Sequence, residues 1–239
     1  MRSNTGDAEN RLLALLPAPE AERWRPHLEL VEMPLGQVIH EPGAELDFAF
    51  FPLTAIVSLL YVMENGASAE ISIVGNDGMV GVSLFMGGTT TCSRAVVQCA
   101  GKGYRFPASR LKSAIERDPA VLQILLRYTQ ALLTQMAQTA VCNRHHNVHQ
   151  QFCRWLLLSL DRLPSNELIM TQELIANMLG VRRQGVTEVA AKLQDQGGIA
   201  YQRGRITVLD RSKLERCSCE CYQVVAKECA RLMSKTQSS

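Results

Sequence analysis

The sequence predicts an α+β protein in which an N-terminal antiparallel β-roll precedes a long helix and a C-terminal winged helix-turn-helix. The distribution of glycine distinguishes the first two parts, because ten of the sixteen glycines lie from Gly36 to Gly103 and none lies from Tyr104 to Leu179. Glycine-rich turns join short strands, whereas a long stretch without glycine favours helices. We therefore expect an N-terminal helix and β-roll (1–118), a dimerisation helix with its hinge (119–146) and a winged helix-turn-helix domain (147–239).

The β-roll is predicted from apolar runs that are separated by turn signals. The runs FAFFPLTAIVSLLYV, AEISIVG and RAVVQCAG are rich in Val, Ile, Phe and Ala, and the turn signals ENG and GNDG lie between them. Such runs are typical of strands in an all-β sandwich or roll. With 239 residues, 46% of them hydrophobic, the chain can bury a core in each of two domains.

The long helix is predicted to begin at Asp118 and Pro119, which supply a side-chain cap and a proline at the first helical position. Apolar residues then recur every three or four positions to about Asn143. This periodicity predicts a helix on the order of 38 Å long. A small β-domain cannot bury all of it, so we expect a partner helix from a second subunit in a two-fold dimer. Packing within one chain is the alternative.

The stretch TQELIANMLGVRRQGVTEVAAKL (171–193) predicts two short helices joined at a glycine. The apolar residues that would face inward are Leu174, Ile175 and Met178 in the first helix and Val186, Val189 and Leu193 in the second. Gly180 can end the first helix in the left-handed conformation, and small Ala176 allows close approach. A unit of this length is typical of a helix-turn-helix, whose second helix enters the DNA major groove.

The polar face of the second helix carries side chains that can contact base edges or phosphates: Arg182, Arg183, Gln184, Thr187, Glu188 and Lys192. Beyond it, GGIAYQRGRITVLD predicts a hairpin with Arg203 and Arg205 at its tip, which is typical of a wing that contacts phosphate. The alternative is an ordinary helical hairpin whose charged residues are merely solvated.

The charge distribution along the chain favours DNA binding by its C-terminal part. Lys and Arg number 7 against 12 Asp and Glu in residues 1–106, 7 against 3 in residues 107–165, and 11 against 8 in residues 166–239. An acidic first part and a basic remainder favour nucleic-acid binding at one end. The sequence has neither an apolar run of membrane-spanning length nor the features of a secretory signal, so we expect a cytoplasmic protein.

The chain resembles the Crp/Fnr family of bacterial transcription regulators over nearly its whole length. The resemblance is carried by TQELIANMLGVRRQGVTEVAAKLQDQGGI with the wing RGRITVLD, and by VGNDGMVGVSLFMGG followed by SRAVVQ. It implies a cyclic-nucleotide-binding-like domain that senses a signal and a dimer helix that transmits it. It also implies three partners, which are palindromic double-stranded DNA, a second copy of the chain and RNA polymerase.

Two departures from the family pattern bear on the ligand and on the operator. Members that bind cyclic AMP place a glutamate after the glycine of the phosphate-binding turn, but here Gly81 is followed by Val82 and Ser83, with Ser93 and Arg94 near the expected phosphate grip. Arg94 can meet an anion, whereas valine cannot accept a ribose hydrogen bond, so cyclic AMP is not favoured and the cofactor stays unknown.

The reading helix also departs from the best-known branch, in which an arginine is followed directly by a glutamate and, four residues further on, by a second arginine. Here these positions hold Arg183, Gln184 and Glu188. Together with Thr187 they are our predicted base-reading residues, and we expect a different operator sequence. The cysteines of the oxygen-sensing branch are missing as well, since the first cysteine is Cys92.

Two groups of residues could bind a metal or sense redox state. In CNRHHNVHQQFC, His145, His149 and Cys153 would share one face if the hinge stayed helical, although a polar joint with no metal is the favoured interpretation. In CSCECYQVVAKEC, we consider redox sensing by Cys217, Cys219, Cys221 and Cys229, against incidental thiols. The spacing of these four thiols does not match a usual closed zinc site.

The sequence argues against two other classes of protein. A ligand-binding module that acts on a protein partner would not need basic residues on both the reading helix and the wing. An enzyme would need a recognisable catalytic set, and no nucleophile with its base, phosphate loop or His-Glu-x-x-His motif stands out in the sequence. We therefore expect a regulator and not an enzyme.

Overall fold

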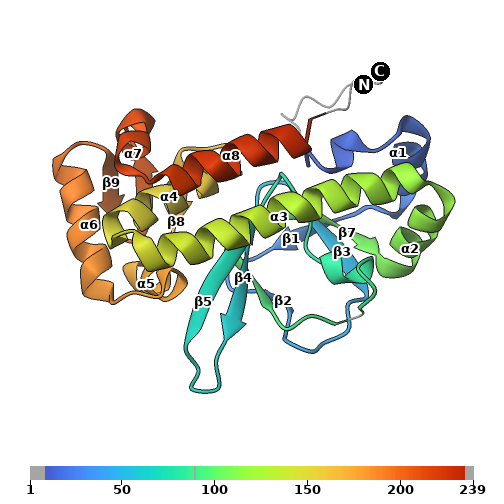
Figure 1. Cartoon of the computed structure of the whole chain (residues 1–239), viewed down its shortest axis with the longest axis horizontal. Coiled ribbons are helices and arrows are strands. Elements are labelled where there is room, and N and C mark those ends of the chain that lie inside the picture. The colour runs from blue at the N-terminus through green and yellow to red at the C-terminus, as the bar shows by residue number, and fades with distance from the viewer. Residues whose placement is uncertain (1–8, 89, 235–239) are drawn as a thin grey trace.

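The computed structural model describes residues 9–88 and 90–234, and it confirms the α+β architecture. Figure 1 shows a β-roll under one long helix, α3, with a smaller, mostly helical domain at the C-terminal end of that helix. The β4–β5 hairpin projects away from the long helix.

Two antiparallel sheets make up the β-roll. The first has the order β1-β7-β3, with β1 at Glu29–Met33, β3 at Phe48–Pro52 and β7 at Gly101–Pro107. The second has the order β2-β6-β4-β5, with β2 at Val38–His40, β4 at Ile56–Val62, β5 at Ser68–Val74 and β6 at Arg94–Cys99. The three apolar runs of the sequence therefore form strands, as predicted.

Short helices cover the end of the roll that lies farthest from the C-terminal domain. They are α1 (Ala18–Trp24) and α2 (Ala108–Arg117), with 3-10 turns at Leu13–Leu15, Arg25–His27 and Val82–Leu84. The ring of Trp24 stacks on Phe106 with the centroids 4.2 Å apart. This aromatic pair buries the junction between α1 and the first sheet.

The long helix α3 runs from Pro119 to His145, and the Asp118 side chain caps it by accepting a hydrogen bond from the Ala120 amide at 2.9 Å. One face, including Val121, Leu125 and Leu132, is buried against the roll. The opposite face leaves three large apolar side chains in solvent: Leu126 is 48% exposed, Leu133 57% and Val141 46%. Packing within the chain therefore buries only part of the apolar surface of this helix.

The helix breaks at the hinge, close to the predicted end at about Asn143, so the condition for the possible metal face of the hinge is not met. His146 and Asn147 have extended backbones, and α4 (Val148–Leu160) begins after Asn147, whose side chain forms a capping box with Gln150. His145 and Cys153 consequently lie on different helices, with His145 exposed and Cys153 buried. The single face that a continuous helix would give His145, His149 and Cys153 does not form, because the capping asparagine starts a new helix after His145.

The C-terminal domain follows the predicted order with additions. Its elements are β8 (Glu167–Ile169), α5 (Gln172–Leu179), α6 (Arg183–Asp195), β9 (Ile199–Gln202), β10 (Arg205–Val208), α7 (Arg211–Cys217) and α8 (Glu220–Leu232). The strand β8 extends the hairpin to a three-stranded sheet of order β8-β10-β9. The last helix, α8, lies against α3 (Figure 1).

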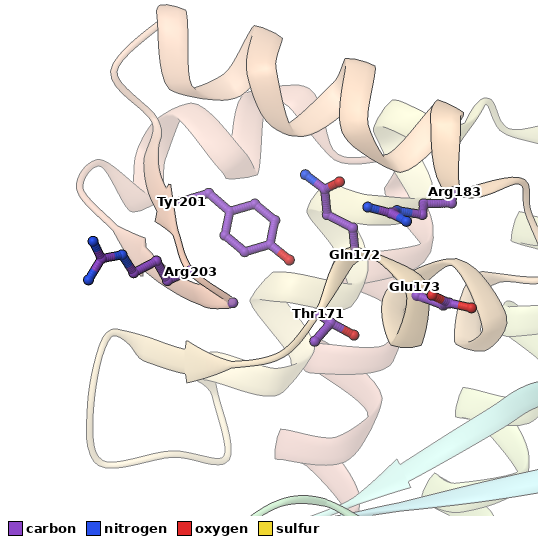
Figure 2. A pocket seen from close by; sticks show the side chains of 7 residues that line it. Thr171, Gln172, Glu173, Arg183, Tyr201 and Arg203 are labelled. Carbon is purple, nitrogen blue, oxygen red and sulfur yellow. The ribbon is translucent and has the colours of Figure 1, made fainter.

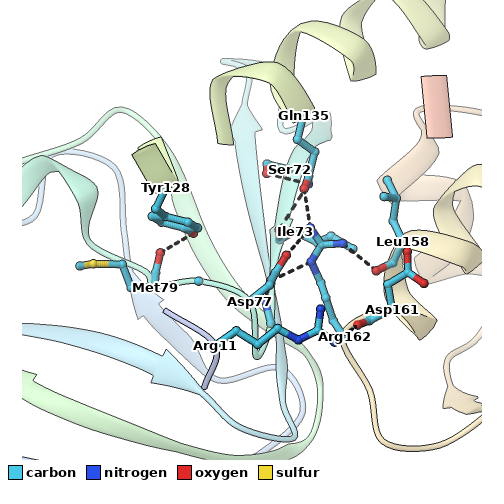
Figure 3. Close-up of polar contacts among 12 residues, drawn as sticks. Arg11, Ser72, Ile73, Asp77, Met79, Tyr128, Gln135, Leu158, Asp161 and Arg162 are labelled. Carbon is cyan, nitrogen blue, oxygen red and sulfur yellow. Dashed lines mark hydrogen bonds and ion pairs between the residues drawn. The ribbon is translucent and has the colours of Figure 1, made fainter. Parts of the chain in front are cut away.

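A buried ion pair joins this domain to the roll and to α3, as Figure 3 shows. The Arg162 guanidinium lies 2.8 Å from the Asp77 carboxylate, which follows β5, and both side chains are almost fully buried. Arg162 also donates to the Gln135 side chain on α3 at 2.8 Å and to the Leu158 carbonyl at 2.7 Å. Its stem passes Gly75 so closely that an added Cβ would lie 2.5 Å from the Arg162 Cβ.

We expect Arg162→Met to destabilise the protein by about 3–5 kcal/mol, because it leaves the Asp77 carboxylate buried without its partner. Denaturant unfolding would measure the change. The matched control is Arg231→Met, which breaks a more exposed ion pair with Glu228 on α8 and should change stability little. Equal effects of the two substitutions would contradict the role given to Arg162.

A second buried polar network lies in the same interface. The Ser58 hydroxyl is within hydrogen-bond distance of both the Glu70 carboxyl and the Gln98 carbonyl oxygen, and the Gln98 amide faces the Met170 sulfur of the C-terminal domain. One hydroxyl proton cannot serve two acceptors, so a protonated Glu70 that donates to Ser58 satisfies the network. Burial raises the pKa of Glu70 to about 7, against the opposing effects of Ser58 and Arg154.

This network gives a pH dependence of stability. The folded protein holds the Glu70 proton more tightly than the unfolded chain, so its stabilising contribution is fully present below pH 4.5 and is lost as the pH rises through about 7. Glu70→Gln keeps the donor and removes the titration. The stability of the wild type relative to this variant should therefore fall between about pH 5 and pH 8 in denaturant unfolding. Parallel pH profiles would show that Glu70 does not titrate in this way.

Candidate nucleic-acid interface

The helix-turn-helix is built as the sequence predicts. The Thr171 side chain caps α5 by accepting from the Leu174 amide at 3.2 Å, and Gly180 ends that helix with a φ of +66°. Ile175 on α5 and Val186 on α6 are both fully buried between the helices. The glycine therefore supplies the left-handed residue that lets α6 cross α5.

All six polar residues that were predicted on the second helix of the helix-turn-helix, here called the reading helix (α6), are exposed. They are Arg182, Arg183, Gln184, Thr187, Glu188 and Lys192. Two of these side chains donate hydrogen bonds to neighbouring side chains. Gln184 donates to Glu188 at 2.9 Å, and Thr187 donates to Gln172 on α5 at 2.7 Å. Arg182 precedes the first residue of α6 and makes no side-chain cap, which leaves the N-terminal amides of α6 open to an anion.

The wing is a tight hairpin whose two turn residues, Arg203 and Gly204, have φ values of +50° and +77°. Positive φ at both positions is typical of the two-residue turns that match the twist of a hairpin. Arg203 is exposed at the tip. Arg205 is the first residue of β10 instead, and its guanidinium pairs with Glu167 on β8 at 2.6 Å. Arg203 is therefore the freer of the two wing arginines.

An open cavity of about 390 Å³ lies between the wing and the two helices (Figure 2). It is lined by Thr171, Gln172, Glu173, Arg183, Tyr201, Arg203 and Gly204. The Tyr201 hydroxyl donates to the Met170 carbonyl at 2.8 Å, and burial raises the pKa of Tyr201, so this phenol stays protonated. Two guanidinium groups at the rim match the charge of a nucleic-acid phosphate.

Sequence reasoning missed Gln172, Glu173 and Tyr201 as lining residues of this cavity. The first two follow the capping Thr171, at the start of α5, and Tyr201 lies on the strand before the wing turn. Only the pairing of the wing with the first turn of α5 brings these segments together. Of the three, Gln172 had a local signal, since the first turn of a helix-turn-helix faces the reading helix.

The five residues proposed for ligand binding lie at two places on the roll. Gly81 has a φ of +110° and precedes the short 3-10 turn that holds Val82 and Ser83. Ser93 hydrogen-bonds Thr91 at 3.0 Å, and the Arg94 guanidinium lies 3.0 Å from the Glu41 carboxylate. An anion at Arg94 would therefore have to compete with Glu41.

The four C-terminal cysteines do not act as one group in the structure. Cys219 and Cys221 are buried at the start of α8, where the Cys219 sulfur lies 3.5 Å from that of Cys142 on α3. Cys217 ends α7, and Cys229 lies two turns along α8 beside Asp77 and Arg162. Cys219 and Cys221 thus cluster with Cys142 of α3, whereas Cys217 and Cys229 lie outside this cluster.

Residues 150–217 match the family model of the Crp-like helix-turn-helix domain. The chain has the Crp/Fnr fold. FixK2 from Bradyrhizobium japonicum superimposes with a TM-score of 0.67 at 15% identity, covering 80% of this chain and 98% of that one. A Crp/Fnr transcriptional regulator from Thermus thermophilus has a TM-score of 0.63 at 24% identity, with coverages of 80% and 98%.

The c-di-GMP responsive global regulator CLP from Xanthomonas campestris has the same Crp/Fnr fold, with a TM-score of 0.62 at 16% identity and coverages of 80% and 99%. No curated protein matches the sequence. These findings confirm the resemblance to Crp/Fnr regulators that was stated from the sequence. Within the part of the chain that the structure describes, no helix is both long and apolar enough to cross a membrane.

Proposed function

We propose that this chain is a sequence-specific DNA-binding transcription regulator whose α6 reads the major groove under control of a signal received by the β-roll. The observation that carries the proposal is the exposed polar face of α6 beside a basic wing, within a Crp-like helix-turn-helix domain. The residues at the expected nucleotide site do not favour cyclic AMP as the signal, since Arg94 is paired with Glu41 and the Val82 side chain cannot form a hydrogen bond.

The side chains divide into two roles under this proposal. Arg183, Gln184, Thr187 and Glu188 contact base edges, and the Gln184–Glu188 hydrogen bond holds two of them in a fixed orientation. Arg182, Lys192 and Arg203 contact phosphates and set the position of the domain on the duplex. Arg205 adds its charge to the wing from within the sheet, where Glu167 orients it.

A second copy of the chain completes the proposed regulator. The exposed face of α3 presents Leu126, Leu133 and Ala140 at seven-residue intervals, which is the spacing that helix pairs bury between them. A two-fold dimer would place two reading helices about one DNA turn apart, ~34 Å. RNA polymerase as a further partner, and the cytoplasm as the location, come from the resemblance and from the sequence alone.

Selection of bound duplexes from a random DNA pool at physiological salt tests this proposal directly. We expect enrichment of a two-fold symmetric motif with half-sites about one turn apart. Selection would be repeated with small anionic ligands, including cyclic nucleotides, in case the free protein has low affinity. Failure to enrich any sequence under all of these conditions would contradict DNA reading.

Arg183→Ala and Arg203→Ala should have different effects on binding to the selected duplex. Arg183→Ala should cost about 1–3 kcal/mol and relax the preference at one position of each half-site, because a base contact is lost. Arg203→Ala should weaken all sequences alike and reduce the salt dependence, because a phosphate contact is lost. Fluorescence anisotropy over a salt series measures both.

The matched control for these variants is Arg216→Ala, an exposed arginine of the same domain on α7. Unchanged affinity and unchanged base preference in Arg183→Ala would show that α6 does not read bases through this residue. An Arg216→Ala effect as large as the other two would point to general electrostatic attraction instead.

The double substitution Leu126→Glu and Leu133→Glu should convert the dimer to a monomer, because it places charges in the proposed helix pair. Sedimentation velocity measures the mass, and DNA affinity should fall with it. The control is Leu30→Glu, where a leucine is similarly exposed at 54% but belongs to β1 of the first sheet and not to α3. A double variant that stays dimeric would place the dimer contact elsewhere.

A further inference from the structure

Four side chains that can ligate a metal converge where the long helix meets the last helix. Cys142 and His146 lie one turn apart at the C-terminal end of α3, and Cys219 and Cys221 lie at the start of α8. One possible ligand atom from each residue can be chosen so that all four lie within 4.8 Å of one another. This grouping takes Cys219 and Cys221 from the C-terminal cysteines and joins them to Cys142 and His146, which belong to neither of the two sets that the sequence suggested.

The distances fit a tetrahedral centre better than a disulfide. The Cys142 and Cys219 sulfurs are 3.5 Å apart, and the Cys221 sulfur is 3.7 Å from Nδ1 of His146. A disulfide would need about 2.05 Å between sulfurs. Ligand atoms about 2.1–2.3 Å from a tetrahedral zinc are about 3.5–3.8 Å from one another. The three thiols are at most 3% exposed and form a cluster separate from the apolar cores.

The histidine is oriented as a ligand with a supporting carboxylate. While Nδ1 faces the Cys221 sulfur, Nε2 lies 3.3 Å from the Glu220 carboxylate. Metal-bound histidines commonly donate the proton of their second nitrogen to a carboxylate, which fixes the tautomer and the ring plane. Glu220 thus lies where it can accept the Nε2 proton of His146 while Nδ1 binds a metal.

The surroundings suit an anionic centre. The Arg154 guanidinium is buried on α4 and donates to Thr139, one turn before Cys142, while its buried Nε has no hydrogen-bond partner among the described residues. Three thiolates and one dication carry a net charge of −1, which would complement this cation. The N-terminus of α8, a helix of 13 residues, also favours negative charge at Cys219 and Cys221.

We propose that Cys142, His146, Cys219 and Cys221 bind one Zn²⁺ ion per chain in a closed tetrahedral site. Binding releases the thiol protons to solvent and leaves no open coordination position, so the ion is structural. The site ties the end of the long helix, just before the hinge, to the helix that closes the C-terminal domain. Zinc would therefore hold α8 against α3 and restrict movement of the reading helix relative to the β-roll.

Metal content of the purified full-length protein is the first test, by elemental analysis after removal of loosely bound metal. We expect about one zinc per chain. Replacement by Co²⁺ should give the visible bands of a tetrahedral site and a sulfur-to-cobalt charge-transfer band. Cys142→Ser, Cys219→Ser and Cys221→Ser should each lower zinc content roughly tenfold or more.

Control variants separate ligation from packing. Cys217→Ser on α7 and Cys229→Ser on α8 change thiols outside the cluster and should keep the zinc. His146→Cys should keep a four-ligand site with an altered cobalt spectrum. Glu220→Gln, at a solvent-exposed position, should weaken zinc binding about tenfold to a hundredfold in a competition with a chelator.

Two results would overturn the proposal. One is a protein with native circular dichroism that contains no zinc and takes up no Co²⁺ under reducing conditions. The other is equal zinc content in the wild type and in a folded Cys142→Ser, Cys219→Ser double variant, which would place the metal elsewhere. A wild type that loses zinc and thermal stability together on chelation would support it.

Discussion

The arrangement of the whole molecule depends on the buried pair of Arg162 and Asp77. Arg162 lies just beyond the end of α4, the first helix of the C-terminal domain, and Asp77 belongs to the turn after β5. Gln135 on the long helix accepts a hydrogen bond from the same guanidinium. A buried charge without its partner is costly, so these three parts of the chain cannot separate independently. A signal that moves the C-terminal domain must therefore preserve this contact or replace it with another.

The interface between the domains combines this ion pair with apolar contacts and with a second polar network. Ile56, Ile73 and Cys99 of the roll pack into the core of the helix-turn-helix domain. Between them, Glu70 and Ser58 form a chain of hydrogen bonds that one added or removed proton rearranges. Apolar packing gives such an interface its area, whereas the polar groups give it a single register.

The sequence predicted those parts of the fold that local chemistry decides. Asp118 with Pro119, Gly180 and the Arg203–Gly204 turn each have a short-range reason to begin or end an element. The strand β8 was missed because three residues carry no periodicity, and it exists only through pairing with β10. The long helix ends near the predicted Asn143, and the shared face that a helical hinge would have given His145, His149 and Cys153 is lost because Asn147 starts a new helix between them.

The candidate sites could likewise be predicted from the sequence only where neighbouring residues form them, and not where distant segments meet. The polar face of α6 follows from helical periodicity, but the pairing of Arg205 with Glu167 needs the third strand of the wing. The thiol and imidazole cluster joins Cys142 and Cys219, which are 77 positions apart in the sequence. Neither sequence segment alone therefore indicates that the other lies beside it. An ion held there would favour only those arrangements in which α8 lies on α3. By linkage, DNA that prefers the same arrangement would tighten metal binding as much as metal tightens DNA binding.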